Sequence, residues 1–144
     1  MEKQSFAFYI SILRKDFVRF CSIELQNLDL TYNQLFILLF INKKEKVTQI
    51  EICKFLKLDK SQLNRTLNKL IEKKFIISLK SETDKRKTII QLTTLGKEIV
   101  AKSKKMFHDW DNEILNDLNK EDQKELMNLM EKLVKKISEE NKWE

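Results

Sequence analysis

The sequence predicts a mainly α-helical fold that contains one small β-hairpin. Residues that form tight turns are nearly absent, since the 144 residues include one Gly and no Pro, and folds built on many turns depend on both. Apolar residues recur every three to four positions over most of the chain, as they do in amphipathic helices. Only within residues 76–92 do short β-branched runs replace this spacing, which indicates two strands.

The composition argues against an enzyme. Gly96 is the only glycine, so the chain lacks the Gly-rich loops that hold phosphate in nucleotide-binding enzymes. His108 is the only histidine, which leaves no pair for a metal site or a proton relay. Cys21 and Cys53 do not have the spacing of zinc ligands. We therefore expect no catalytic residues, no metal and no cofactor.

The chain is expected to be one cytoplasmic domain, 1–144. This length favours a single domain. The longest apolar run, Leu35 to Ile41, is far shorter than the ~20 residues that span a bilayer. No small-residue cleavage site follows the first apolar stretch, so no signal peptide is predicted, and two Cys without a secretory signal suggest a reducing compartment.

The positive charge is concentrated in the middle of the sequence. Residues 43–87 hold 14 of the 28 Lys and Arg but only 6 of the 22 Asp and Glu, which gives this segment a net charge of +8 within a chain of net charge +6. A basic segment of this kind is typical of a surface that binds a polyanion. The alternative is a solvated face rich in lysine.

Four helices are expected before the hairpin. The apolar spacing predicts the first over residues 6–28. Each of the next three begins with a capping box. In this motif the side chain of the N-cap residue accepts from the backbone N–H of the residue three positions later, and that residue's side chain accepts from the backbone N–H of the N-cap residue. The boxes are Thr31 with Gln34, Thr48 with Glu51 and Asp59 with Gln62, and they predict helices over about 31–42, 48–56 and 59–73.

The helices over 48–56 and 59–73 form the pattern of a helix-turn-helix. Leu63, Leu67, Leu70 and Ile71 are expected on the buried face of the second helix. The N-terminal part of such a helix enters the DNA major groove, where Arg pairs with guanine and Asn or Gln with adenine. An ordinary solvated face is the alternative. The outward face of the helix over 59–73 consists of Ser61, Gln62, Asn64, Arg65 and Asn68, and Lys60 and Lys69 lie on its flanks, where they can contact the DNA backbone.

The predicted hairpin has strands over 76–79 and 88–92, and a polar loop that we expect to be open and mobile because it lacks Gly. An Arg at a loop tip can enter the DNA minor groove, and Asp84 can hold the guanidinium of Arg86. The alternative is an exposed ion pair that contributes ~0–1 kcal/mol. The expected contacts are Asp84, Lys85, Arg86 and Lys87.

Two further helices, over 95–118 and 120–140, complete the chain, with Asn119 as a candidate N-cap between them. With helix 6–28 they form two arms around the basic lobe. The arms carry larger apolar faces than a small lobe can cover, which favours pairing with a partner helix over contact with lipid. The residues expected at this interface are Phe6, Ile10, Leu13, Leu126, Leu129, Leu133 and Ile137.

Several short runs resemble the MarR family of winged-helix transcription regulators. They are Leu30-Thr31-Tyr32-Asn33-Gln34, Val47-Thr48-Gln49, Leu56-Lys57-Leu58-Asp59-Lys60-Ser61, Asp84-Lys85-Arg86 and Leu92-Thr93-Thr94-Leu95-Gly96. The Asp-x-Arg and Leu-Thr-x-x-Gly motifs are the most specific of these. The resemblance covers about residues 6–140.

The resemblance implies a winged helix-turn-helix lobe over 30–93 and dimerisation arms over 1–29 and 94–144. It also implies a recognition helix at 59–73, a wing at 80–88 and a homodimer on a near-palindromic operator. Two features depart from the family. Lys74 stands where the family usually has Gly, and the first helix begins Phe6-Ala7-Phe8-Tyr9, without the Cys of the peroxide-sensing branch.

We therefore expect a sequence-specific regulator of transcription that binds double-stranded DNA, as a dimeric repressor without a membrane partner. The alternative is a winged-helix module for protein–protein contact. The family also implies release of DNA by a small phenolic or anionic effector, although aromatic residues at helical spacing are more often core. Cys21 is expected to pack rather than to sense redox state. The candidate effector pocket is formed by Tyr9, Phe17, Tyr32, Phe36 and Trp110.

Overall fold

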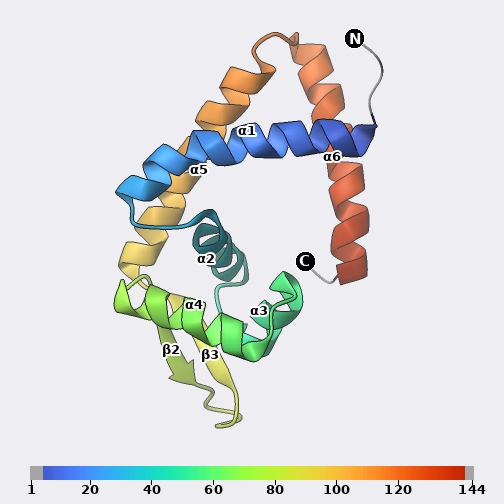
Figure 1. The fold of residues 1–144 in the computed structure, drawn as a ribbon. Coiled ribbons are helices and arrows are strands. Elements are labelled where there is room, and N and C mark those ends of the chain that lie inside the picture. The colour runs from blue at the N-terminus through green and yellow to red at the C-terminus, as the bar shows by residue number, and fades with distance from the viewer. Residues whose placement is uncertain (1–4, 142–144) are drawn as a thin grey trace.

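A computed structural model describes residues 5–141, with side chains up to residue 137. Six helices and three short strands follow one another along this part of the chain (Figure 1). Their order is α1 (Phe6–Asn27), α2 (Tyr32–Lys44), β1 (Val47–Thr48), α3 (Gln49–Leu56), α4 (Lys60–Glu72), β2 (Ile76–Lys80), β3 (Thr88–Leu92), α5 (Thr94–Leu115) and α6 (Lys120–Asn141). The predicted fold class, mainly helical with a small hairpin, is confirmed.

All three predicted capping boxes are present, at the starts of α2, α3 and α4. The side chain of Asn119 accepts from the backbone N–H of Asp122 at 2.8 Å, as an N-cap of α6 does. Helix α5 ends at Leu115, three residues earlier than the predicted end. Local capping chemistry therefore sets most helix starts in this chain.

A three-stranded antiparallel sheet has the order β1-β3-β2, with Val47 opposite Ile90 and Ile76 opposite Leu92. Strand β1 was not predicted, because two residues are too short to show a period. The loop between β2 and β3 is longer than a two-residue turn, as predicted. It is closed by internal hydrogen bonds, however, whereas an open loop was predicted. Ser81 is buried within it, and its backbone N–H donates to the carbonyl of Lys87 at 3.0 Å.

The core lies where α2 is surrounded by α1, α5 and the sheet. Leu35, Leu38 and Ile41 of α2 are fully buried and pack with Ile52, Leu63 and Ile90. Helices α5 and α6 form a V whose turn lies at the opposite end of the molecule from α4 and the hairpin (Figure 1). None of the side chains described in α6 is buried, so this arm adds little to the core of one chain.

Lys74 adopts the left-handed conformation, with φ 63°. Its N–H donates to the carbonyl of Ile71 at 2.9 Å, and the N–H of Phe75 donates to that of Leu70 at 3.1 Å. These two bonds form the Schellman motif that normally ends on Gly. Helix α4 thus ends as it would with the glycine usual in the family, on a residue that is less suited to this conformation.

Candidate nucleic-acid interface

Helices α3 and α4 form the helix-turn-helix. Lys57 is left-handed, with φ 55°, and it turns the chain so that Asp59 becomes the N-cap of α4. The side chain of Asp59 accepts from the N–H of Gln62 at 2.7 Å. Leu63, Leu67 and Leu70 are buried as predicted. Ile71 was expected with them but is 37% exposed, because it lies at the edge of the buried face near the end of α4.

The outward face of α4 is exposed at all seven predicted residues, Lys60, Ser61, Gln62, Asn64, Arg65, Asn68 and Lys69. Two of these side chains are already engaged. The amide oxygen of Gln62 accepts from the N–H of Asp59, and Asn64 accepts a hydrogen bond from Gln49 of α3. Arg65 forms no ion pair with any residue that the structure describes. Its five donors are available to a ligand.

The hairpin and its loop, β2, β3 and residues 81–87, form the wing. One carboxylate oxygen of Asp84 accepts from the backbone N–H of Arg86 at 3.0 Å and lies 3.5 Å from its Nε. The carbonyl of Asp84 accepts from the N–H of Lys87 at 2.9 Å. Asp84 therefore shapes the loop through the backbone and also orients the Arg86 guanidinium, whose side chain is 94% exposed.

A groove of about 380 Å³ lies between α3, the start of α4 and the wing. Among the described residues, its lining includes four cationic side chains and no acidic one: Lys54, Lys60, Arg86 and Lys87. Such a groove concentrates positive potential. Lys54 and Gln49 were not among the residues predicted from the sequence to contact DNA. Lys54 belongs to the basic segment 43–87, but only the fold shows that it faces the wing.

The candidate effector pocket is filled by its own aromatic rings. Phe17 contacts Trp110 at 5.0 Å and Tyr32 at 5.7 Å between ring centroids, and Tyr32 is stacked on Phe36 at 6.2 Å. Tyr9 lies in the first turn of α1, before Phe17, and is half-buried. Four of the five predicted residues are thus brought together as an aromatic row, which is packing and not an open pocket.

Cys21 is fully buried, and burial raises the pKa of its thiol to about 11. A thiol of this kind stays protonated and unreactive near neutral pH. The expectation that Cys21 packs in the core is confirmed. Cys53 is half-buried against the core.

The predicted interface residues on the arms are accessible. Phe6 is 61% exposed, Leu129 51% and Leu133 45%. The remaining four, Ile10, Leu13, Leu126 and Ile137, are also exposed or half-exposed. No helix in residues 5–141 is both long enough and apolar enough to cross a membrane, and these described residues contain no cluster of three metal-ligating side chains.

Known proteins are similar to this chain both in sequence and in fold. The MarR family model matches residues 28–87. The HTH-type transcriptional regulator BilQ of Clostridium symbiosum is 35% identical over 133 residues, which are 92% of this chain and 92% of that protein. The chain belongs to the MarR family. Its curated relatives are named as transcriptional regulators.

Solved structures of MarR agree with this assignment. A crystal structure of MarR superposes with a TM-score of 0.87 at 26% identity, over 96% of this chain and 95% of that one. A mutant MarR from E. coli, complexed with operator DNA, superposes with a TM-score of 0.72 at 26% identity, over 88% and 91%. This MarR-family protein is a transcription regulator with a DNA-binding winged helix.

Proposed function

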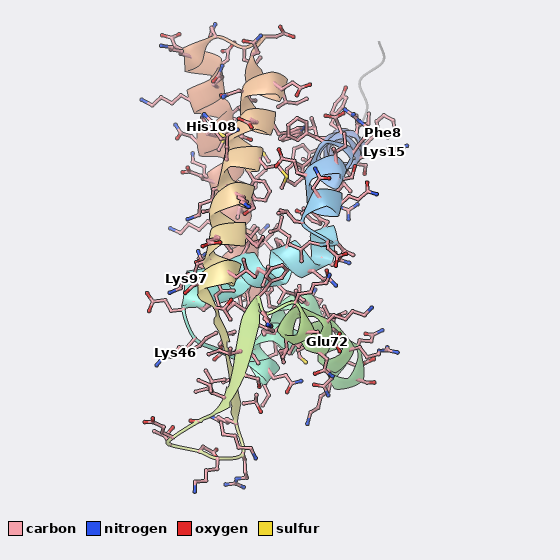
Figure 2. The ribbon with its side chains drawn as sticks, turned by 90° about the vertical axis from the view of Figure 1, so that its left-hand side faces the viewer. Phe8, Lys15, Lys46, Glu72, Lys97 and His108 are labelled. Atoms are coloured by element: carbon pink, nitrogen blue, oxygen red, sulfur yellow. The ribbon has the colours of Figure 1, made fainter. Side chains whose placement is uncertain are left out.

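We propose that this MarR-family chain acts as a cytoplasmic dimeric repressor that binds a near-palindromic operator. The observation that carries the proposal is that α4 and the wing lie at the same end of the molecule (Figure 2), where Lys60 at the start of α4 and Arg86 and Lys87 of the wing line the cationic groove. In this arrangement α4 enters the major groove and Arg86 the adjacent minor groove. The residues assigned to DNA are Lys60, Ser61, Gln62, Asn64, Arg65, Asn68, Lys69, Asp84, Lys85, Arg86 and Lys87.

The dimer part of the proposal rests on the arms. Helix α6 carries a row of exposed apolar residues along one face, at positions 126, 129 and 133. Two-fold pairing through 1–29 and 94–144 buries such a face and sets two 30–93 lobes at a fixed spacing. Half-sites one helical turn apart are the geometric consequence.

A small phenolic or anionic effector completes the proposal. Such a ligand releases DNA only if it binds more tightly to a lobe arrangement that the operator does not match. The aromatic row between α1, α2 and α5 links arm and lobe, and it can transmit a shift between them.

A selection of duplexes from a random pool tests DNA binding. We expect enrichment of one near-palindromic sequence, with an affinity that falls steeply as salt rises because phosphate contacts release counterions. Arg86→Ala should weaken binding more than Lys85→Ala or Lys87→Ala, with Lys102→Ala on α5 as the control. Binding that shows neither sequence preference nor salt dependence would favour a protein–protein module.

A further inference from the structure

Two side-chain amides on the outward face of α4 have their oxygen atoms engaged within the protein. Oε1 of Gln62 accepts from the backbone N–H of Asp59 at 3.4 Å, and Oδ1 of Asn64 accepts from Nε2 of Gln49 at the start of α3. A side-chain amide has one oxygen that accepts and one NH₂ group that donates. In both residues the NH₂ group is therefore the part that is left for a ligand.

The orientation of the Gln62 amide is set by its partner. A backbone N–H can only donate, so it must face the oxygen of Gln62 and not its NH₂ group. The same two residues complete the capping box, because the N–H of Gln62 donates to Oδ1 of Asp59 at 2.7 Å. Gln62 is exposed, and its NH₂ group has no hydrogen-bond partner among the described residues.

The orientation of the Asn64 amide depends on Gln49, the first residue of α3. The preceding residue, Thr48, forms the capping box of α3 with Glu51 and pairs with Ile89 of the wing strand β3. The backbone next to Gln49 is thus fixed both by α3 and by the sheet. Gln49 is half-buried, whereas Asn64 is exposed, so Gln49 supports Asn64 from the side of the protein.

Hydrogen-bond donors therefore dominate the centre of the outward face. The guanidinium of Arg65 has donors only, and the free parts of the Gln62 and Asn64 amides are donors as well. Ser61 and Asn68 differ, because their side chains have no hydrogen-bond partner within the described chain and keep both a donor and an acceptor. Of the three outward amides, only Asn68 has a free oxygen.

This distribution of donors matches some base edges better than others. In the major groove guanine presents two acceptors and thymine presents one, whereas cytosine presents a donor and adenine presents a donor beside its acceptor. An Asn that recognises adenine uses both its oxygen and its NH₂ group. Asn64 cannot do so while Gln49 holds its oxygen, so a base with acceptors alone is the better match.

We propose that Gln49 is a positioning residue that sets the base preference of Asn64. By holding Oδ1 of Asn64, it directs Nδ2 toward the DNA, where the contacted base is guanine in first place and thymine in second. The pairing of Asn with adenine that the sequence suggested then applies to Asn68 and not to Asn64. This inference rests on the operator binding proposed above.

Two substitutions of Gln49 should act on Asn64 in opposite ways. In Gln49→Lys the new ammonium can only donate, so Oδ1 of Asn64 stays turned toward α3. In Gln49→Glu the new carboxylate can only accept, so Asn64 turns its NH₂ group toward α3 and its oxygen toward the DNA. Ile50→Glu is the matched control, because Ile50 is 59% exposed in the same groove and the substitution adds the same charge.

Competition binding on single-base variants of the selected operator measures the preference. The base pair that Asn64 contacts is the one at which Asn64→Ala loses discrimination. There the wild type and Gln49→Lys should favour guanine over adenine on the same strand by at least about fivefold, and Gln49→Glu should favour adenine. Ile50→Glu should bind all sequences more weakly and keep the wild-type preference, since phosphate repulsion carries no base information.

Three outcomes would overturn the proposal. The first is a wild-type preference for adenine at this pair, which would mean that Asn64 donates to Gln49 and turns its oxygen to the DNA. The second is a folded Gln49→Glu variant with the same preference as Ile50→Glu, which would reduce Gln49 to packing between α3 and α4. The third is an Asn64→Ala variant that loses discrimination at no base pair.

The hydrogen bond is also tested without DNA, by NMR of the nitrogen-labelled full chain. Donation to a protein group slows the exchange of an N–H proton with water. The Asn64 NH₂ protons should exchange freely in the wild type and in Gln49→Lys, and more slowly in Gln49→Glu. If these signals respond as expected but no duplex binds, the proposed function fails and the positioning role stands. If an operator is bound but the Asn64 signals are the same in all three proteins, the positioning role fails alone.

Discussion

The carbonyl oxygen of Phe75 occupies the space where a Cβ atom on Gly96 would stand. The same carbonyl accepts from the N–H of Thr93 at 3.0 Å, and Thr93 Oγ1 accepts from the N–H of Gly96 at 3.0 Å and donates to the carbonyl of Lys74 at 2.6 Å. The Leu-Thr-x-x-Gly motif is thus a structural joint between the end of α4 and the start of α5. The only glycine of the chain is used for close approach and not for a left-handed turn.

Gly96→Ala should lower the free energy of unfolding by about 1–3 kcal/mol, since backbone must move to admit the methyl group. The direction is diagnostic because Ala in a helix is otherwise favoured over Gly by about 1 kcal/mol. Urea unfolding followed by circular dichroism, with variant and wild type at the same protein concentration, measures the change in the free energy of unfolding. Lys97→Ala, at the exposed next position, should change stability by less than about 0.5 kcal/mol. A Gly96→Ala variant as stable as the wild type would refute the close approach.

Lys74→Gly should raise the free energy of unfolding by about 1 kcal/mol, because the left-handed conformation is costly for a residue with a Cβ atom. The same unfolding assay applies. The matched control is Glu72→Gly, two residues earlier in the helical conformation, which should lower stability by up to about 1 kcal/mol. If Lys74→Gly and Glu72→Gly changed the free energy of unfolding in the same direction, the assigned end of α4 would be contradicted.

Features encoded by neighbouring residues could be predicted from the sequence. Each capping box needs only two residues three positions apart, and all three were found. The outward face of α4 also follows from helical periodicity alone, which is why its seven residues are exposed as expected.

Features that depend on distant residues could not be predicted. Strand β1 exists because Val47 pairs with Ile90, far along the chain. The bonds from Gln49 to Asn64 and from Lys73 to Gln34 likewise arise only when helices pack. The aromatic residues were assigned to a pocket on the family resemblance, and their spacing alone does not tell whether Phe17 faces a ligand or another ring.

Asp16→Asn should destabilise the protein at neutral pH but not in acid. Hydrogen bonds from Arg19 at 2.7 Å and from Trp110 at 3.1 Å hold the pKa of Asp16 below its usual value of 3.8. A lowered pKa in the folded state stabilises the fold above about pH 4, and this contribution is lost as the pH falls through the folded-state value. Unfolding curves of the wild type and of Asp16→Asn at several pH values measure how their difference in stability depends on pH.

Leu129→Glu with Leu133→Glu should produce monomers or unfolded protein, because both side chains lie on the exposed apolar row of α6. Analytical ultracentrifugation measures the mass, and circular dichroism shows whether the chain is folded. The control, Asn128→Glu with Lys124→Gln, changes the net charge equally on the opposite face of α6 and should stay dimeric. A double leucine variant that still sediments as a dimer would exclude this face from the interface.

Arg65→Ala distinguishes recognition of a base from contact with phosphate. Arg65 is exposed one turn into α4, between Ser61 and Asn68, and we favour a bidentate contact with guanine because Lys60 and Lys69 flank the helix on the side of the DNA backbone. Loss of that contact should cost about 1–3 kcal/mol on the selected operator and relax specificity at one base pair.

Arg65→Lys sharpens this distinction because it keeps the charge but loses the planar fork of donors. If Arg65 contacts guanine, the Lys variant should keep the salt dependence of the wild type yet lose discrimination at the same base pair. If Arg65 holds a phosphate, Arg65→Lys should bind nearly as the wild type does. Arg65→Ala should then lose affinity uniformly across sequences, with a salt slope smaller by about one ion. Competition binding on the operator and its single-base variants, at several salt concentrations, separates the two outcomes.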